Sequence, residues 1–160
     1  RRTWGQGILA DCRTFFPSTT PVQLAEEYAR GFREHVDKVQ VEPGAVAALD
    51  GLAARGLPLA VVTNSPRQLT EEILRAVGLW ERFDAAATGD EVSEGKPAPE
   101  IISLALERLG VEAGQGVVMV GDTDNDAEAA RRASIPFVGY RIPGDATIER
   151  LDQLWEALGL

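Results

Sequence analysis

The sequence predicts an α/β fold in which a parallel sheet is flanked by helices. Short apolar runs rich in β-branched residues alternate with longer segments of helical periodicity, which is the pattern of βαβ units. A length of 160 residues suits one domain with a sizeable core. The two strongest apolar runs are followed at once by polar residues, and ligands of parallel sheets gather at that carboxyl edge.

The first part of the chain favours helices. Thr20 and Pro21 stand in the order of a helix cap and a first helical residue, and apolar side chains follow at helical spacing. Residues 40–44 are typical of a linker. A second helix is expected over about 45–55, ending at Gly56.

Strands and helices alternate beyond the linker. Residues 58–63 predict a strand buried on both faces, and Ser65 and Pro66 predict the cap and first residue of a helix that ends at Gly78. Residues 83–88 are a weaker strand candidate because three alanines dilute the run. The remaining expected elements are a helix over about 98–109, a strand over 116–120, a helix over about 125–133, a strand over 136–140 and a last helix capped by Thr147.

The composition narrows the range of partners. The chain has 16 basic and 25 acidic residues, and its net charge of −9 argues against nucleic acid, whose phosphates require a basic surface. The single cysteine, Cys12, excludes a disulfide framework, and no apolar run is long enough to cross a membrane. We therefore expect a cytoplasmic protein whose partner is a small molecule. Neither Cys12 nor the lone His35 is expected to be catalytic.

An acidic segment follows the strand expected at 116–120. Asp122, Asp124 and Asp126 crowd together there, and carboxylates at a strand end repel each other unless a cation or hydrogen-bond donors compensate. This favours a hard metal ion, although the same residues are also common at a helix N-terminus. A calcium loop of the EF-hand type is excluded because Ala127 and Ala133 replace its glycine and its closing glutamate.

Two further segments have the chemistry of an anion site. Thr63 and Asn64 follow the first strand and precede a helix N-terminus, a setting that suits a phosphate oxyanion and is also an ordinary helix entry. Lys96 lies between Gly95 and Pro97 in a stiff loop that can direct its ammonium group at an anion, although most loop lysines are simply solvated. As a loop lysine it is expected to contribute little to stability.

The order and spacing of these segments resemble the haloacid dehalogenase superfamily. Thr63, Lys96 and the Gly121-Asp122-x-x-x-Asp126 segment match its second, third and fourth motifs. The likeness runs from about residue 43 to the C-terminus and is closest to the phosphoglycolate phosphatase branch. The stretches that carry it are 56–64, 95–99 and 120–130. The resemblance implies a Rossmann-like core.

The resemblance also implies an activity and residue roles. Thr63 and Asn64 would hold the phosphoryl group, Lys96 would steady nucleophile and phosphate, and Asp122 would ligate Mg²⁺, with Asp126 ligating it or fixing the loop. Lys96 and Thr63 are thus the catalytic candidates. The implied reaction is Mg²⁺-dependent hydrolysis of a small phosphate monoester, such as phosphoglycolate, through an aspartyl-phosphate. A sugar-phosphate mutase and an inactive phosphate-binding module are the alternatives, and the protein is expected to be a monomer or homodimer.

One family motif does not occur in the sequence. The superfamily's first motif, Asp-x-Asp-x-Thr after an apolar strand, supplies nucleophile and general acid, and the nearest candidate, Asp11, lacks the second aspartate. We therefore expect residues 1–40 to be the remnant of a helical cap and residues 41–160 to be a core missing its first strand. On this hypothesis the chain is an N-terminally truncated enzyme that is inactive alone. Its strands at 59–62 and 117–120 should stay roughly 10 Å apart, two strand spacings, instead of pairing directly.

Overall fold

The computed structural model describes residues 6–114 and 116–160. Helices and short strands alternate from α3 to β4, as the sequence predicts. The helices are α1 (Ile8–Thr14), α2 (Pro21–Glu34), α3 (Ala45–Ala54), α4 (Arg67–Ala76), α5 (Glu100–Leu109), α6 (Asp124–Arg132) and α7 (Leu154–Leu158), with 3-10 turns η1 (Val36–Lys38), η2 (Trp80–Arg82) and η3 (Leu151–Gln153). The strands are β1 (Ala60–Thr63), β2 (Ala85–Thr88), β3 (Met119–Gly121), β4 (Phe137–Tyr140) and β5 (Ala146–Ile148).

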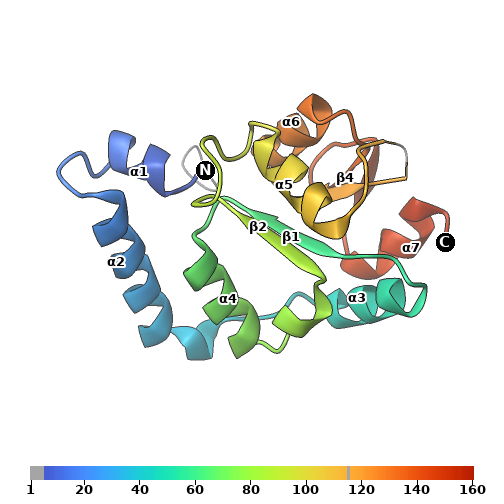
Figure 1. Cartoon of the computed structure of the whole chain (residues 1–160). Helices are drawn as coiled ribbons and strands as arrows, with labels where there is room; N and C mark the ends of the chain where they lie inside the picture. The colour runs from blue at the N-terminus through green and yellow to red at the C-terminus, as the bar shows by residue number, and fades with distance from the viewer. Residues whose placement is uncertain (1–5, 115) are drawn as a thin grey trace.

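Every strand pair in the described part of the chain is parallel, which confirms the predicted α/β fold. Strand β1 pairs with β2, with Val62 opposite Ala87, and β3, β4 and β5 form a second sheet in that order. Figure 1 shows the β1–β2 ribbon in the centre, with α4 on one side and α5 on the other. Two layers of helices therefore enclose the strands.

The buried core forms two clusters, and the larger one joins the two sheets. One buried cluster joins α5 and α6 to β2, β3 and the start of β4, and includes Ile101, Ala129 and Phe137. A smaller cluster, which includes Leu52 and Ile148, joins α3 and α7 to β4 and β5. These clusters fix the carboxyl ends of the strands, where the candidate residues lie.

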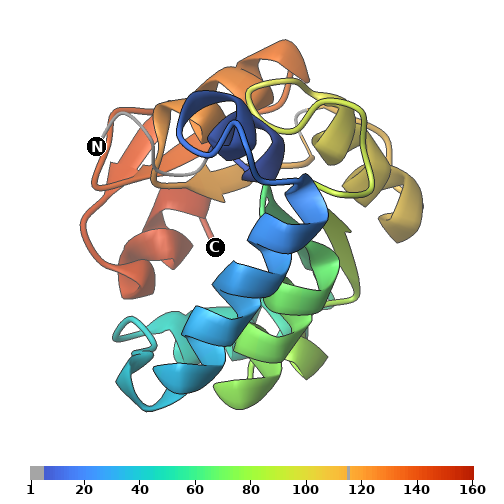
Figure 2. The same ribbon diagram turned by 90° about the vertical axis from the view of Figure 1, so that its left-hand side faces the viewer.

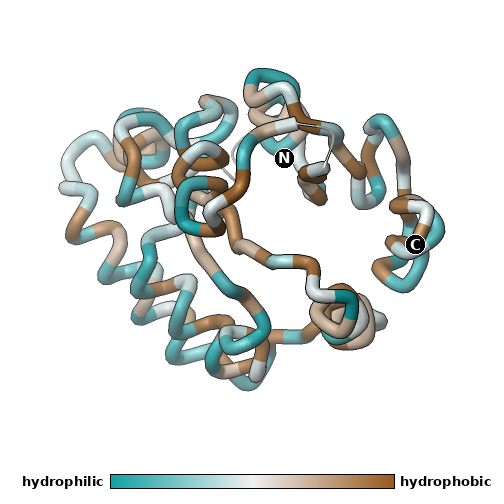
Figure 3. Tube along the Cα trace, turned by 45° about the vertical axis from the view of Figure 1, so that its right-hand side comes forward, coloured by the Kyte–Doolittle hydropathy of each residue, from teal (hydrophilic) through white to brown (hydrophobic). Residues whose placement is uncertain are grey.

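Helix α2 packs against α4, and α1 packs against α2. Helix α2 runs alongside α4, as Figures 1 and 2 both show, and Arg33 of α2 forms two hydrogen bonds with Glu72 of α4. Both helices alternate between hydrophobic and hydrophilic residues (Figure 3) and bury one side, including Leu24 and Leu69. No helix among the described residues combines the length and apolar character needed to span a membrane.

Asp11 lies on helix α1 and not at a strand end. Its carboxylate accepts hydrogen bonds from Gln6 at 2.8 Å and from the Tyr28 hydroxyl at 2.9 Å. Burial, together with the bond to Asp11, raises the pKa of Tyr28 to about 12. Asp11 thus ties α1 to α2, and no hydrogen bond in the described structure joins it to Thr63, Asn64 or Lys96. The structure therefore gives it the contacts of a packing residue.

Two predicted helix caps are wrong, and one helix was missed. Ser65 does not cap α4, because the helix begins one residue later and has Pro66 at its cap position without a side-chain hydrogen bond. Thr147 does not cap a helix but lies within β5, a strand of three residues that is too short to give a sequence signal. Helix α1 was not expected. The predicted cap at Thr20 is confirmed, because its side chain accepts from the Gln23 N–H.

The strand predicted at 58–63 is not buried on both faces. All four residues of β1 are only half-buried, and Val120 of β3 is 37% exposed. The physical reason is that, among the residues that the structure describes, no strand pairs with β1 on the side away from β2 or with β3 on the side away from β4. This confirms the expectation that the two strands do not pair directly.

Candidate functional site

The Lys96 ammonium lies between the two sheets. Its Nζ donates to the Val62 carbonyl of β1 at 2.9 Å and to Asp126 Oδ1, on α6, at 2.7 Å. Its side chain is only 11% exposed, and that of Asp126 only 5%. Of the two interpretations of Lys96, the solvated loop lysine is wrong, because the loop after β2 folds back over the strand ends and places the charge in a buried ion pair.

Asp126 organises the loop between β3 and α6. Its Oδ2 accepts from the Thr123 hydroxyl at 2.6 Å, from the Thr123 N–H at 3.0 Å and from the Asp122 N–H at 3.3 Å. The Thr123 side chain in turn accepts from the Asp126 N–H, which completes a capping box at the start of α6. Both carboxylate oxygens are thus engaged, which supports the loop-fixing role among the two roles expected for Asp126. The role of Thr123 was not identified from the sequence, although the Thr-x-x-Asp spacing is a capping-box signal.

Asp122 has a different environment from Asp126. Its side chain is exposed at the carboxyl edge of β3, and no described residue donates a hydrogen bond to its carboxylate. Mg²⁺ is commonly held by one or two carboxylates together with water and substrate phosphate oxygens. Asp122 fits the carboxylate part of that set. The described residues hold no group of three or more His, Cys, Asp or Glu side chains that would complete a protein-only metal site.

Thr63 and Asn64 lie where β1 ends. Thr63 is half-buried, and its hydroxyl accepts from the Ser65 N–H at 3.2 Å. Asn64 is buried, and its side chain forms hydrogen bonds with both backbone groups of Lys96. The ends of β1 and β3 and the loop after β2 therefore bring Thr63, Asn64, Lys96 and Asp126 together, with Asp122 on the same loop as Asp126.

A second charged network anchors the loop that carries Lys96. Glu91, just after β2, accepts from Arg67 of α4 and Arg108 of α5, and also from the Thr88 hydroxyl at 2.8 Å. The hydrogen bonds from Arg108, aided by those from Arg67 and Thr88, hold the pKa of Glu91 at about 2. This network was not predicted, because its two arginines lie 24 and 17 positions from Glu91 along the chain. It ties the loop to a helix on each side.

The Glu91 network gives a pH-dependent prediction. The folded-state pKa lies below the ordinary value of 4.5, so the ionised carboxylate stabilises the fold above about pH 4.5, and this contribution is lost as the pH falls towards about 2. Glu91→Gln should lower the unfolding free energy by about 1–2 kcal/mol at neutral pH. Urea titrations from pH 2.5 to 7 measure the difference. Glu112→Gln, at an exposed loop position, is the control, and a difference for Glu91→Gln that does not shrink towards low pH would contradict the assignment.

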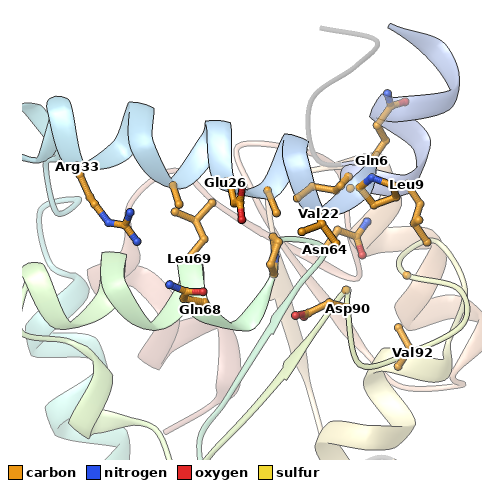
Figure 4. Close-up of a pocket in the computed structure, with 18 residues that line it drawn as sticks. Gln6, Leu9, Val22, Glu26, Arg33, Asn64, Gln68, Leu69, Asp90 and Val92 are labelled. Carbon is orange, nitrogen blue, oxygen red and sulfur yellow. The ribbon is translucent and has the colours of Figure 1, made fainter. Parts of the chain in front are cut away.

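A pocket of about 840 Å³ adjoins these residues. Figure 4 shows it between α2 and α4, with Glu26 projecting from α2, Leu69 from α4 and Asn64 at its inner end. Gly95, next to Lys96, also lines it. The pocket is an opening of organic-molecule size beside the strand ends, with a largely apolar wall.

The amino-acid sequence of the chain is similar to those of known hydrolases. A family model described as haloacid dehalogenase-like hydrolase matches residues 8–134. The phosphoglycolate phosphatase of Escherichia coli (strain K12) is 36% identical over 124 residues, which cover 72% of this chain and 49% of that protein. A plasmid-encoded phosphoglycolate phosphatase of Cupriavidus necator is 39% identical over 122 residues, covering 74% of this chain and 52% of that protein.

Solved structures extend the likeness to the fold. The crystal structure of a HAD phosphatase from Thermococcus onnurineus superimposes with a TM-score of 0.76 at 32% identity, covering 82% of this chain and 64% of that one. The chain spans about half the length of the curated relatives that it matches.

Proposed function

The chain belongs to the haloacid dehalogenase-like hydrolases, and from this we propose that the protein acts as a phosphatase on a small phosphate monoester of the phosphoglycolate type. The observation that supports the proposal best is the buried Lys96 ammonium, which contacts the Val62 carbonyl, one residue before Thr63, and the Asp126 carboxylate. An ammonium group among strand-end oxygens and hydroxyls is suited to hold a phosphoryl group.

The proposed roles follow from the environment of each residue. Lys96 offsets the negative charge of the phosphoryl oxygens, and the Thr63 hydroxyl, on the half-buried end of β1, hydrogen-bonds to one of them. Asp126 holds Lys96 and the β3–α6 loop in place. The reaction is proposed to pass through an aspartyl-phosphate, because a carboxylate nucleophile splits one difficult step into two easier ones. No residue of this chain is assigned as that nucleophile.

Mg²⁺ is the proposed cofactor, with Asp122 as its carboxylate ligand. When bound, the ion would neutralise charge on the phosphoryl group. Residues 1–40 are proposed to belong to the cap that covers the substrate, and residues 41–160 to the core. The pocket between α2 and α4 lies where those two parts meet, which suits the organic part of a small phosphorylated metabolite.

Ligand-induced stabilisation tests the proposed function. Tungstate or inorganic phosphate should raise the melting temperature, because a ligand that binds only the folded state stabilises it in proportion to the logarithm of its concentration. The rise should be larger with Mg²⁺ present. Lys96→Met should lose most of the rise, and Asp122→Asn should lose only the Mg²⁺-dependent part. Scanning fluorimetry measures all three.

The control for this experiment is Lys38→Met, which removes the chain's other lysine, exposed in η1. It should keep the full response to both additives. Equal rises in the parent and in Lys96→Met would refute the assignment of Lys96 to a phosphate site. Equal Mg²⁺ effects in the parent and in Asp122→Asn would refute the metal ligand.

A further inference from the structure

Asn64 holds the backbone of Lys96 through a reciprocal pair of hydrogen bonds. The Lys96 N–H donates to Asn64 Oδ1 at 2.7 Å, and Asn64 Nδ2 donates to the Lys96 carbonyl at 2.8 Å. The side chain of Asn64 thus binds both the N–H and the carbonyl of Lys96, which lies 32 positions further along the chain. Asn64 is only 8% exposed, so water does not compete for these bonds.

Two glycines allow the loop to lie this close to Asn64. A Cβ atom at Gly95 would stand 2.4 Å from Asn64 Oδ1, and one at Gly89 would stand 2.3 Å from the Asn64 carbonyl oxygen. Both distances are shorter than any that a real Cβ atom makes to a non-bonded heavy atom. The loop from Gly89 to Lys96 therefore fits against Asn64 only because these positions carry no side chain.

We propose that Asn64 is a positioning residue that acts through Lys96. The paired bonds fix the Lys96 backbone over the end of β1, and the side chain then extends to Val62 and Asp126 instead of into solvent. This differs from the role that the family resemblance implies, in which Asn64 itself holds the phosphoryl group. It rests on the proposed function only for the claim that Lys96 faces phosphate.

Lysine labelling tests the proposal without any ligand. The chain has two lysines, Lys96 and the exposed Lys38, so the second is an internal reference. Limited acetylation with acetic anhydride, followed by mass spectrometry, should label Lys96 far more slowly than Lys38 in the parent. Asn64→Ala should raise the Lys96-to-Lys38 ratio about tenfold, since it removes two hydrogen bonds.

Two variants make the labelling result specific. Gly95→Ala leaves Asn64 present but pushes its side chain away, and it should raise the ratio as Asn64→Ala does. Gln68→Ala should leave the ratio unchanged, because Gln68 lines the same pocket but donates to Glu72. If Asn64→Ala does not fold, Asn64→Asp replaces it, since aspartate keeps the shape and the acceptor but loses the donor. An unchanged ratio in folded Asn64 and Gly95 variants would overturn the proposal.

A double-mutant comparison separates positioning from direct contact with phosphate. If Asn64 acts through Lys96, the double variant Asn64→Ala/Lys96→Met should lose no more tungstate stabilisation than Lys96→Met alone. A further loss in the double variant, measured with enough tungstate to show residual binding, would instead assign Asn64 a contact of its own with the anion. Absence of any tungstate effect in the parent would count against the proposed function, while the labelling ratios would still decide the role of Asn64.

Discussion

Lys96→Met is expected to lower the unfolding free energy by about 3–5 kcal/mol, a far larger effect than a loop lysine would give. The substitution keeps most of the aliphatic length and removes the charge. It leaves Asp126 as a buried carboxylate without its counter-charge, because the side chain of Asp126 is only 5% exposed. The three hydrogen bonds from Thr123 and from the Asp122 N–H remain, but they do not neutralise it.

The companion variant removes both charges. In Lys96→Met/Asp126→Asn the asparagine oxygen still accepts from Thr123, and no buried charge is left unpaired. This double variant should recover more than half of the stability that Lys96→Met loses, as measured by urea unfolding at pH 7. Lys38→Met is the matched control and should change stability by less than about 0.5 kcal/mol. A loss below about 1 kcal/mol for Lys96→Met would show that the Lys96–Asp126 pair is solvated in solution.

Much of the candidate site was predictable because strand ends are easy to find in a sequence. The apolar runs before Thr63 and before Asp122 indicate two parallel strands, and parallel strands end at one edge. That is why residues nearly 60 positions apart were expected together. Lys96 was singled out by its position between Gly95 and Pro97, but only the family resemblance joined it to the residues at the strand ends.

The remaining features depend on contacts that no local pattern reveals. Burial of Lys96 results from a loop that folds over β1, and that path depends on Asn64 and on the space left by Gly95. Strand β5 was missed because three residues held by pairing to β4 carry no periodicity. Strand β1 is only half-buried because no described strand pairs with it on the side away from β2. Strand pairing depends on the whole sheet, so the residues of β1 alone could not predict this.

The unpaired sides of β1 and β3 lead to the prediction with the largest expected effect on activity. Backbone groups along the free side of a strand favour pairing with another strand. Here they accompany half-buried or exposed apolar side chains, with Val120 at 37% exposure, and the Val62 carbonyl is bonded by a lysine side chain. We propose that one more strand fits between β1 and β3 in the active enzyme. The family's first motif, which follows such a strand, would place a carboxylate beside Lys96.

A fused segment tests this directly. About six apolar β-branched residues followed by Asp-x-Asp-x-Thr, joined to the N-terminus by a flexible Gly-Ser linker, should pair with β1 and β3. We expect the chain alone to show no turnover of p-nitrophenyl phosphate, and the fusion to show Mg²⁺-dependent turnover together with a higher melting temperature. The same segment with Asn in place of both aspartates should raise the melting temperature without turnover, because it supplies the strand but not the nucleophile.

A segment with its apolar residues replaced by serine should neither raise the melting temperature nor give turnover. If the apolar segments leave the melting temperature unchanged, or if the chain alone already hydrolyses the ester, the fold does not hold a place for this strand and the nucleophile must be sought among the residues of this chain.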